Sequence, residues 1–240
     1  MLYMDVMKMD GKSIKVVAIS DLHGYLPEIP ECDLLCICGD LVPLNVQANS
    51  RKTRKWLIEE FKPWCESLPC HKVLFIAGNH DIHFENLDFM KAQFPKDDKV
   101  TYLFNEEYKY QSKNGKIYSI FGTPYCQIFG NWAFMLPSKE LEKAYSKIPE
   151  NLDILMTHDA PYGVSDIILQ EDCSWYDGKT HIGNKPLSQE ILRKAPKIVL
   201  HGHLHSTSRI FEEWGYSKVA NCSIKDEHYN PVYDPLIFEL

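Results

Sequence analysis

Polar residues that can bind metal ions follow five short apolar runs of the sequence. They are carboxylates, one amide and several imidazoles, with no cysteine among them. In chain order they occur in DLH (21–23), GD (39–40), GNHD (78–81), HD (158–159) and HGHLH (201–205). Imidazole nitrogens combined with carboxylate or amide oxygens, without thiolates, suit Mn, Fe, Zn or Ni. The pattern therefore predicts a site for divalent metal ions.

The supply of candidate ligands exceeds what one ion needs. Seven groups, one of them a bridging carboxylate, would fill two metal sites and leave open positions for water or substrate. Two metal ions ~3.5–4 Å apart stabilise both the attacking and the leaving oxygen in a displacement at phosphorus. A single structural metal is the alternative, but such a site is closed by about four ligands. The sequence thus favours two metals and phosphoester chemistry.

The elements that must position these residues are short strands alternating with helices. Continuous apolar runs bounded by turn residues predict strands that are buried on both faces. These runs are IKVVAIS (14–20), DLLCIC (33–38), KVLFIA (72–77), KIYSIF (116–121), DILMT (153–157) and KIVL (197–200). The alternation predicts an α/β fold with a central sheet covered by helices on both faces. The five ligand-bearing loops would then meet at the carboxyl edge of one sheet.

Three segments have a helical pattern, and each has an expected start. Residues 49–64 begin with a cap at Asn49 or Ser50 and are expected to stop at Pro63. The other two helices are expected over 138–147, capped by a serine at the start, and over 187–195, capped by Ser188.

The remaining segments bear on domain organisation. The stretches 209–224 and 231–240 predict strands joined by turns, without a helix between them. With no linker or repeat in the sequence, we expect a single domain over 1–240. The long irregular segment 162–186 is expected to be functional, because such loops inside compact domains usually are.

Three glycines directly precede candidate ligands. Gly39, Gly78 and Gly202 stand where the chain must turn sharply off a strand without a Cβ in the way.

Composition limits the partners. The net charge of −7 and the pI of about 5.8 argue against binding of long nucleic acid, which needs a basic surface, but not against a small phosphate ester. The first twelve residues alternate apolar and charged types, and the longest apolar runs are far shorter than the ~20 residues of a membrane span. The eight cysteines form no CxxC pair. These features predict a cytoplasmic protein with no membrane partner.

The ordered motifs resemble those of the calcineurin-like metallophosphoesterases. DLH, GD, GNHD, THDAP (157–161) and GHLH (202–205) match that family in order and spacing from residue 14 to about 205, and KVANCSI…PLIFEL resembles its closing strands. The resemblance implies a four-layer α/β (α+β) fold. In that fold, mixed central β-sheets are flanked by helices, with a dimetal site at the carboxyl ends of the strands.

The resemblance also implies roles for individual residues. The implied ligands are Asp21, His23 and His205 for the first metal, Asp40 as the bridge, and Asn79, His158 and His203 for the second metal. His80 is implied to be a catalytic residue, not a ligand: it faces the phosphate as general acid or charge stabiliser. A metal-bridging hydroxide is the implied nucleophile.

Two features separate branches of the family. The segment GDLVP lacks the VDRG-type sequence that follows GD in serine/threonine protein phosphatases. The pattern THDAP…GNKPL…GHLH is similar to the small phosphodiesterase branch that contains the metallophosphoesterase-domain brain proteins. This implies a phosphodiesterase acting on a small diester such as a cyclic nucleotide, with Mn²⁺ the favoured metal.

Other activities on the same dimetal site stay open. They are a phosphomonoesterase, a nucleotide pyrophosphatase, a nuclease, or a binding scaffold that has lost catalysis. The natural substrate, the metal used in the cell, the oligomeric state and the pathway do not follow from the sequence.

The roles of several residues outside the implied ligand set also stay open. Asp81, Asp159 and His201 could orient a ligand or His80, or could hold turns. In several branches an aspartate shortly after GD supports the catalytic histidine, but here LVPLN follows, so the partner of His80 is not predicted. The basic cluster 51–55 fits a phosphate or a solvated helix start. The aromatic stretch 123–137 fits stacking on a base or aryl group, core packing or a dimer contact.

Overall fold

The computed structural model describes residues 13–173 and 177–240. The N-terminal segment 1–12, in which apolar and charged residues alternate, lies outside the described residues, as do residues 174–176 within the irregular segment 162–186. Within the described ranges, no helix combines the length and apolar character needed to cross a membrane.

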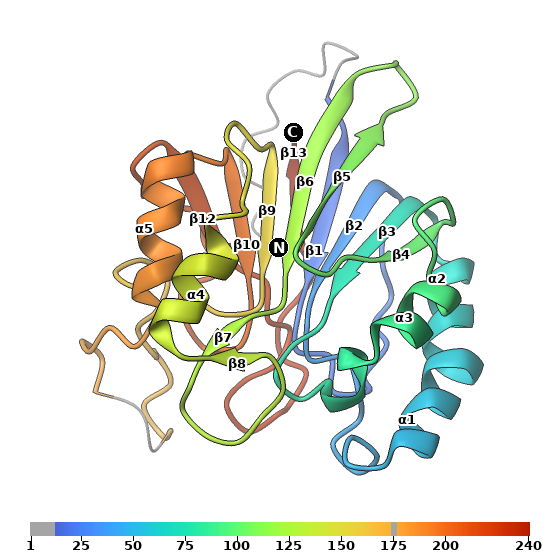
Figure 1. Ribbon diagram of the computed structural model, residues 1–240, viewed down its shortest axis with the longest axis horizontal. Helices are drawn as coiled ribbons and strands as arrows, with labels where there is room; N and C mark the ends of the chain where they lie inside the picture. The colour runs from blue at the N-terminus through green and yellow to red at the C-terminus, as the bar shows by residue number, and fades with distance from the viewer. Residues whose placement is uncertain (1–12, 174–176) are drawn as a thin grey trace.

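Two mixed sheets form the centre of the fold, as the family resemblance implied, whereas the strand pattern alone predicted one sheet (Figure 1). The first has the order β13-β1-β2-β3-β4, formed by Leu236–Glu239, Lys15–Ile19, Cys32–Cys38, Cys70–Ile76 and Val100–Tyr102. The second has the order β11-β12-β10-β9-β6-β5, formed by Glu212–Trp214, Ser217–Asn221, Ile198–His201, Ile154–Thr157, Ile117–Thr123 and Glu106–Gln111. A two-stranded piece, β7 and β8, comprises Cys126–Gln127 and Met135–Leu136.

The ligand-bearing strands run parallel within their sheets. β1, β2 and β3 are adjacent and parallel in the first sheet, and β9 and β10 are adjacent and parallel in the second. The edge strands β13, β11 and β5 are antiparallel to their neighbours. All five ligand loops therefore leave the carboxyl ends of inner strands.

The apolar strands are buried on both faces, as their composition predicted. In β1, Val17 and Ile19 pack into a cluster with the helices beside the first sheet. Val16 and Ala18, on the opposite face, pack into a second cluster shared with strands of the other sheet. Because side chains alternate along a strand, only a continuous apolar run can fill both clusters. The sheets thus pack face to face through the second cluster.

Helices cover the two outer faces and complete four layers (Figure 1). Beside the first sheet lie α1 (Ser50–Trp56), the π-helix η1 (Leu57–Phe61), α2 (Lys62–Ser67), the 3-10 helix η2 (Ile82–Glu85) and α3 (Leu87–Gln93). Beside the second sheet lie α4 (Ser138–Tyr145) and α5 (Lys185–Lys194), packed onto a third apolar cluster. The predicted fold class, with mixed sheets flanked by helices, is confirmed.

Three helix boundaries differ from the predicted ones: the end of the first helical segment and the caps of α5 and α4. Pro63 does not stop the first helical segment, which continues to Ser67. The turn before it is widened to a π turn, in which the Lys62 N–H bonds to the Leu57 carbonyl, and such turns accommodate an interrupted hydrogen-bond ladder. Asn184 rather than Ser188 caps α5, because its side chain accepts from the Leu187 N–H.

The predicted cap is present at the start of α1 and absent at the start of α4. Asn49 caps α1, as one of the two expected residues, by accepting from the Lys52 N–H. Pro137 precedes α4, so Ser138 is its first residue rather than its cap.

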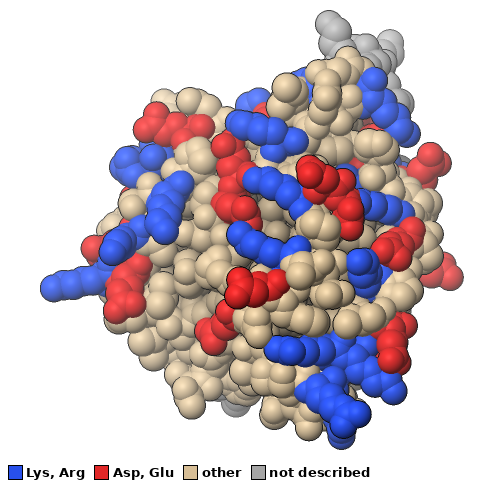
Figure 2. Space-filling view, turned by 45° about the vertical axis from the view of Figure 1, so that its right-hand side comes forward, with Lys and Arg blue, Asp and Glu red and all other residues tan. Residues whose placement is uncertain are grey.

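Charges are mixed over the molecular surface that Figure 2 shows, where Lys and Arg lie among Asp and Glu. Ion pairs at the surface include Lys55 with Glu59 and Arg193 with Glu190. Within the basic cluster 51–55, Arg54 lies over the Phe89 ring at 4.6 Å. These contacts favour the solvated helix start over a phosphate site for this cluster.

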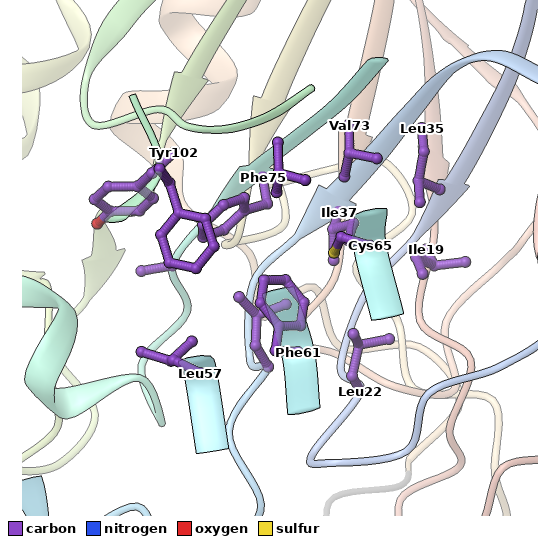
Figure 3. Packing of buried hydrophobic residues seen from close by; sticks show 14 of the residues in the cluster. Ile19, Leu22, Leu35, Ile37, Leu57, Phe61, Cys65, Val73, Phe75 and Tyr102 are labelled. Carbon is purple, nitrogen blue, oxygen red and sulfur yellow. The ribbon is translucent and has the colours of Figure 1, made fainter. Parts of the chain in front are cut away.

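An aromatic cluster fills the core between the first sheet and its helices (Figure 3). Phe75 on β3 lies at its centre, with ring centroids 5.3 Å from Phe61, 4.9 Å from Phe94 and 5.3 Å from Tyr102. The cluster holds β3 against the helical layer, and the GNHD loop follows β3 directly.

Replacing Phe75 with alanine is expected to lower the free energy of unfolding by about 3–5 kcal/mol, since the void cannot refill among these rigid rings. Chemical denaturation measures the change. The matched control is Tyr216→Ala, a side chain that is 91% exposed, for which about 0.5 kcal/mol or less is expected. Equal losses in the two variants would contradict the assignment of this core.

Candidate metal centre

The expected ligands come from both sheets, not from the edge of one sheet as predicted. Asp21 and His23 follow β1, Asp40 follows β2 and Asn79 follows β3, all in the first sheet. His158 follows β9, and His203 and His205 follow β10, in the second sheet. Apolar periodicity shows that a strand is buried but not which sheet it joins, so the sequence could not separate the two sets.

Hydrogen bonds between the two sheets bring these strand ends together. His158 donates from Nδ1 to the Cys38 carbonyl at 2.8 Å, across the interface between the sheets. The His203 backbone N–H donates to the Asp21 carboxylate, with nitrogen to oxygen distances of 3.1 and 3.2 Å. The site is thus built at the junction of the sheets.

The three glycines fit this close approach. A Cβ on Gly78 would lie 2.2 Å from Asp40 Oδ1, and one on Gly39 would lie 2.5 Å from His158 Nδ1. A Cβ on Gly202 would lie 2.0 Å from Ser20 Oγ. Only Gly39 has a positive φ, +98°, so the requirement at Gly78 and Gly202 is space rather than backbone conformation.

Two groups of side chains could each hold an ion. Asp21, His23 and His205 form one group, and Asp21, Asp40 and His158 form the other; within each, the candidate ligand atoms lie within 4.8 Å of one another. Asp40 faces both, with Oδ2 at 3.6 Å from His23 Nε2 and Oδ1 at 3.4 Å from His158 Nε2. That position suits a bridging carboxylate.

The remaining two expected ligands lie beside the second group. Asn79 Oδ1 is 3.0 Å from His158 Nε2. The His203 ring centroid is 5.2 Å from that of His158, and His203 belongs to neither group. Its assignment as a ligand therefore depends on the resemblance more than on the geometry.

The side chain of His23 shows that the residues present fit a cation. It is buried, and neither of its ring nitrogens has a hydrogen-bond partner. A buried unpaired polar group is costly, and an ion bound by one ring nitrogen would relieve that cost. The donor set of imidazoles, carboxylates and one amide matches transition metals of intermediate softness.

The site balances its buried charges through carboxylate–imidazole pairs. Burial favours neutral His158, but the Asp40 carboxylate outweighs it and raises the pKa of His158 to about 10. Burial also favours neutral His205, but the Asp21 carboxylate outweighs it and raises the pKa of His205 to about 9. For His23, burial outweighs the raising effect of Asp40 and Asp21 and lowers the pKa to about 4. Because ligands must be deprotonated, cation binding would displace the protons held on His158 and His205.

The backbone at this site is held in an unusual conformation. Asp21, His23, Asp40 and His203 all have positive φ, at 58°, 41°, 55° and 68°. Left-handed backbone costs energy in residues other than glycine and persists where the surrounding structure enforces it. At these positions the backbone turns sharply at the ends of the strands, which brings the expected ligand side chains to the metal centre.

His80 occupies the rim of the site and has an orienting partner. Its ring lies 5.0 Å from that of His23, and its backbone N–H donates to Asp40 Oδ1 at 2.8 Å. Its Nδ1 is 2.7 Å from Gln47 Oε1. With the amide oxygen as acceptor, Nδ1 carries the hydrogen and Nε2 is left for substrate.

Gln47 is a residue that the sequence analysis missed. It lies seven positions after Asp40 in a turn that starts at Pro43, whose carbonyl accepts from the Val46 and Gln47 N–H groups. Glutamine carries no motif signal, so only the folded turn reveals that it fills the place of the missing aspartate.

Replacing Gln47 with leucine is expected to lower kcat by about 10-fold or more, because the His80 ring loses the contact that fixes its angle. The loss should be larger for diphenyl phosphate than for bis(p-nitrophenyl) phosphate, because the poorer leaving group depends more on protonation. Asn45→Ala, an exposed neighbour in the same turn, is the matched control. An equal loss with both esters would indicate general distortion instead of a role through His80.

Three polar residues that adjoin expected ligands in the sequence bond to loop segments and not to the His80 side chain. They are Asp81, Asp159 and His201. Asp81 accepts from the backbone N–H groups of Leu41, Val42 and Gly78, which ties the GD and GNHD loops together. Asp159 accepts from the Gln127 N–H and the Asn184 amide. His201 is buried and contacts the Gly202 carbonyl.

The findings from comparison with known proteins agree with this geometry. The model of the calcineurin-like phosphoesterase family matches residues 14–207. The chain belongs to this family, and it is a dinuclear metallophosphoesterase, a hydrolase of phosphoric ester bonds.

Individual relatives cover most of the chain. Metallophosphoesterase domain-containing protein 1 of Homo sapiens is 28% identical over 247 residues, which cover 94% of this chain and 71% of that protein. A UPF0046 protein of Caenorhabditis elegans is 26% identical over 244 residues, covering 95% and 81%. The solved structure of the sulfate thiohydrolase SoxB of Thermus thermophilus with glycerol has a TM-score of 0.39 and 14% identity, covering 87% of this chain and 51% of that chain.

Proposed function

We propose that this protein is a metal-dependent phosphodiesterase that hydrolyses a small diester such as a cyclic nucleotide. The observation that carries the proposal is His80. It lies at the rim of the two ligand groups, is oriented by Gln47, and is not itself placed among the ligand atoms. A histidine in that position can protonate the oxygen that leaves from phosphorus. A scaffold without catalysis would have no need of it.

The proposed roles of the side chains follow the implied ligand set. In this proposal, seven residues hold two divalent ions, with Mn²⁺ favoured: Asp21, His23, Asp40, Asn79, His158, His203 and His205. The ions would neutralise phosphate charge and lower the pKa of water at the site. Asp40 faces both ligand groups. In its doubly protonated form, His80 would bond to Gln47 through Nδ1 and deliver the Nε2 proton to the leaving oxygen.

The rim of the site supports a diester over a monoester. Three neutral side chains border His80 and His203 at the rim: the amide of Gln47 and the rings of Trp132 and Phe129. A diester carries one negative charge and a monoester dianion carries two, so a neutral rim favours the diester. The interspersed surface charges in Figure 2 also suit a small substrate rather than long nucleic acid. We extend the proposal to a single cytoplasmic domain over 1–240.

The test is a paired assay on metal-stripped protein after Mn²⁺ is added back. Rates are compared for bis(p-nitrophenyl) phosphate and p-nitrophenyl phosphate. We expect Mn²⁺-dependent turnover with a higher kcat/KM for the diester. A preference for the monoester would support a phosphatase instead, and no turnover of either ester with two metals bound would support a scaffold.

A further inference from the structure

A loop between β7 and β8 reaches over the metal centre. At its start, the Gln127 N–H donates to Asp159 Oδ2 at 2.8 Å, beside the expected ligand His158. At its end, the Ala133 N–H donates to the carbonyl of Asn79 at 3.1 Å. The loop is therefore fixed at both ends to segments that carry expected ligands.

Two aromatic side chains of this loop are exposed next to the site. Phe129 is 55% exposed and Trp132 is 37% exposed. The Trp132 ring lies 4.3 Å from that of His80, with 40° between the planes. The Phe129 ring lies 5.0 Å from that of His203, with 39° between the planes. Each ring thus borders one side of the place where a phosphate would bind.

Core packing does not account for these two rings. Within the same loop, Ala133 and Phe134 are buried and join the aromatic core cluster. Phe129 and Trp132 keep large apolar faces in solvent, although burial of aromatic surface is strongly favourable. Exposed apolar surface at the rim of a site marks ligand contact.

We propose that Phe129 and Trp132 form a stacking subsite for a flat aromatic group that is ester-linked to the phosphate. This inference rests on the proposed phosphodiesterase function and specifies its substrate class. The group next to Trp132 lies on the side of His80, which is the leaving-group side. The group next to Phe129 lies on the side of His203. The shared chemistry is a π face, which an aryl ester and a nucleobase both provide.

The expected size of the effect follows from stacking. Base–aromatic stacking contributes about 1–3 kcal/mol per ring on alanine substitution, which corresponds to a factor of about 5–150 in affinity. The aromatic group should therefore strengthen binding by about 10-fold or more over the same phosphate without a ring.

The test measures binding rather than turnover, on the full chain loaded with Mn²⁺. Calorimetry gives Kd for two matched pairs: phenyl phosphate against methyl phosphate, and adenosine 5′-monophosphate against ribose 5-phosphate. In the unmodified protein the aromatic member should bind about 10-fold or more tightly in at least one pair. The pair that shows the preference distinguishes an aryl ester from a nucleobase.

Variants locate the preference. In the double variant Phe129→Ala, Trp132→Ala, the affinity ratio should fall close to 1, while Kd for methyl phosphate and ribose 5-phosphate stays unchanged. Ile128→Ala is the matched control, because this side chain is 57% exposed in the same loop. It should retain the ratio.

The outcomes separate this inference from the proposed function. A ratio near 1 in the unmodified protein, or a ratio that survives in the double variant, would overturn the subsite. Equal weakening of all four ligands would also overturn it, since it would indicate a structural role. A ratio that collapses in the double variant, in a protein that hydrolyses no diester, would support the subsite and reject the phosphodiesterase.

Discussion

Replacing Asp40 with asparagine is expected to slow phosphodiester hydrolysis by about 1,000-fold or more. Asp40 is buried and faces both ligand groups, with one carboxylate oxygen toward His23 and the other toward His158. Burial would raise the pKa of the Asp40 carboxyl, but the protonated His158 beside it holds that pKa well below the usual range, so Asp40 carries its negative charge at neutral pH. Asparagine has the same shape without that charge.

The magnitude follows from the role of the metals. Losing about 4 kcal/mol of charge stabilisation corresponds to about a 1,000-fold slower reaction. Metal analysis after reloading should show that the bound metal falls from two ions per chain to one or none. The His80 N–H can still donate to the asparagine oxygen, so the GNHD loop keeps its anchor.

The control for loss of charge alone is Asp97→Asn, which changes an exposed carboxylate. It should keep two metals and full activity. If Asp40→Asn also kept both metals and its activity, the bridging assignment would be wrong.

Replacing His80 with alanine should lower kcat by about 10²–10⁴-fold, the usual contribution of a positioned proton donor. The metal content should not change, because the side chain is not among the ligand atoms and the backbone N–H to Asp40 remains. The loss should be greatest for diesters with poor leaving groups. Kinetics with a series of aryl diesters measures this dependence.

The matched control is His71→Ala, on the opposite end of the same strand β3, where the histidine contacts Tyr110. Its activity should equal that of the unmodified protein. A His80→Ala variant that lost metal, or that lost the same factor with every leaving group, would contradict the role as proton donor.

The sequence predicted the parts of this structure that depend on local pattern. The segments VVAI (16–19) and VLFI (73–76) are apolar at every position, which is the mark of a strand with both faces covered, and both lie in inner strands. The polar residues after them lie where open sheets hold ligands. The glycines at 39, 78 and 202 were predicted for the right reason, lack of room for a Cβ.

The parts that depend on long-range contacts could not be predicted from pattern. Nothing in the runs at 153–157 and 197–200 shows that they pair in a second sheet with β6 and β12. Pro63 is a helix stop by local rules, but packing of Leu57 and Phe61 into the core carries the helix past it. Gln47 gains its role only because a turn brings its amide to His80.

The position of the metal centre between two sheets links folding to metal supply. An ion held by residues of both sheets binds the folded chain and not the unfolded one, so free metal at 100 times its Kd would stabilise the protein by about 2.7 kcal/mol. The melting temperature should therefore rise with metal concentration. Without bound metal, we expect the folded protein to be less stable as well as less active.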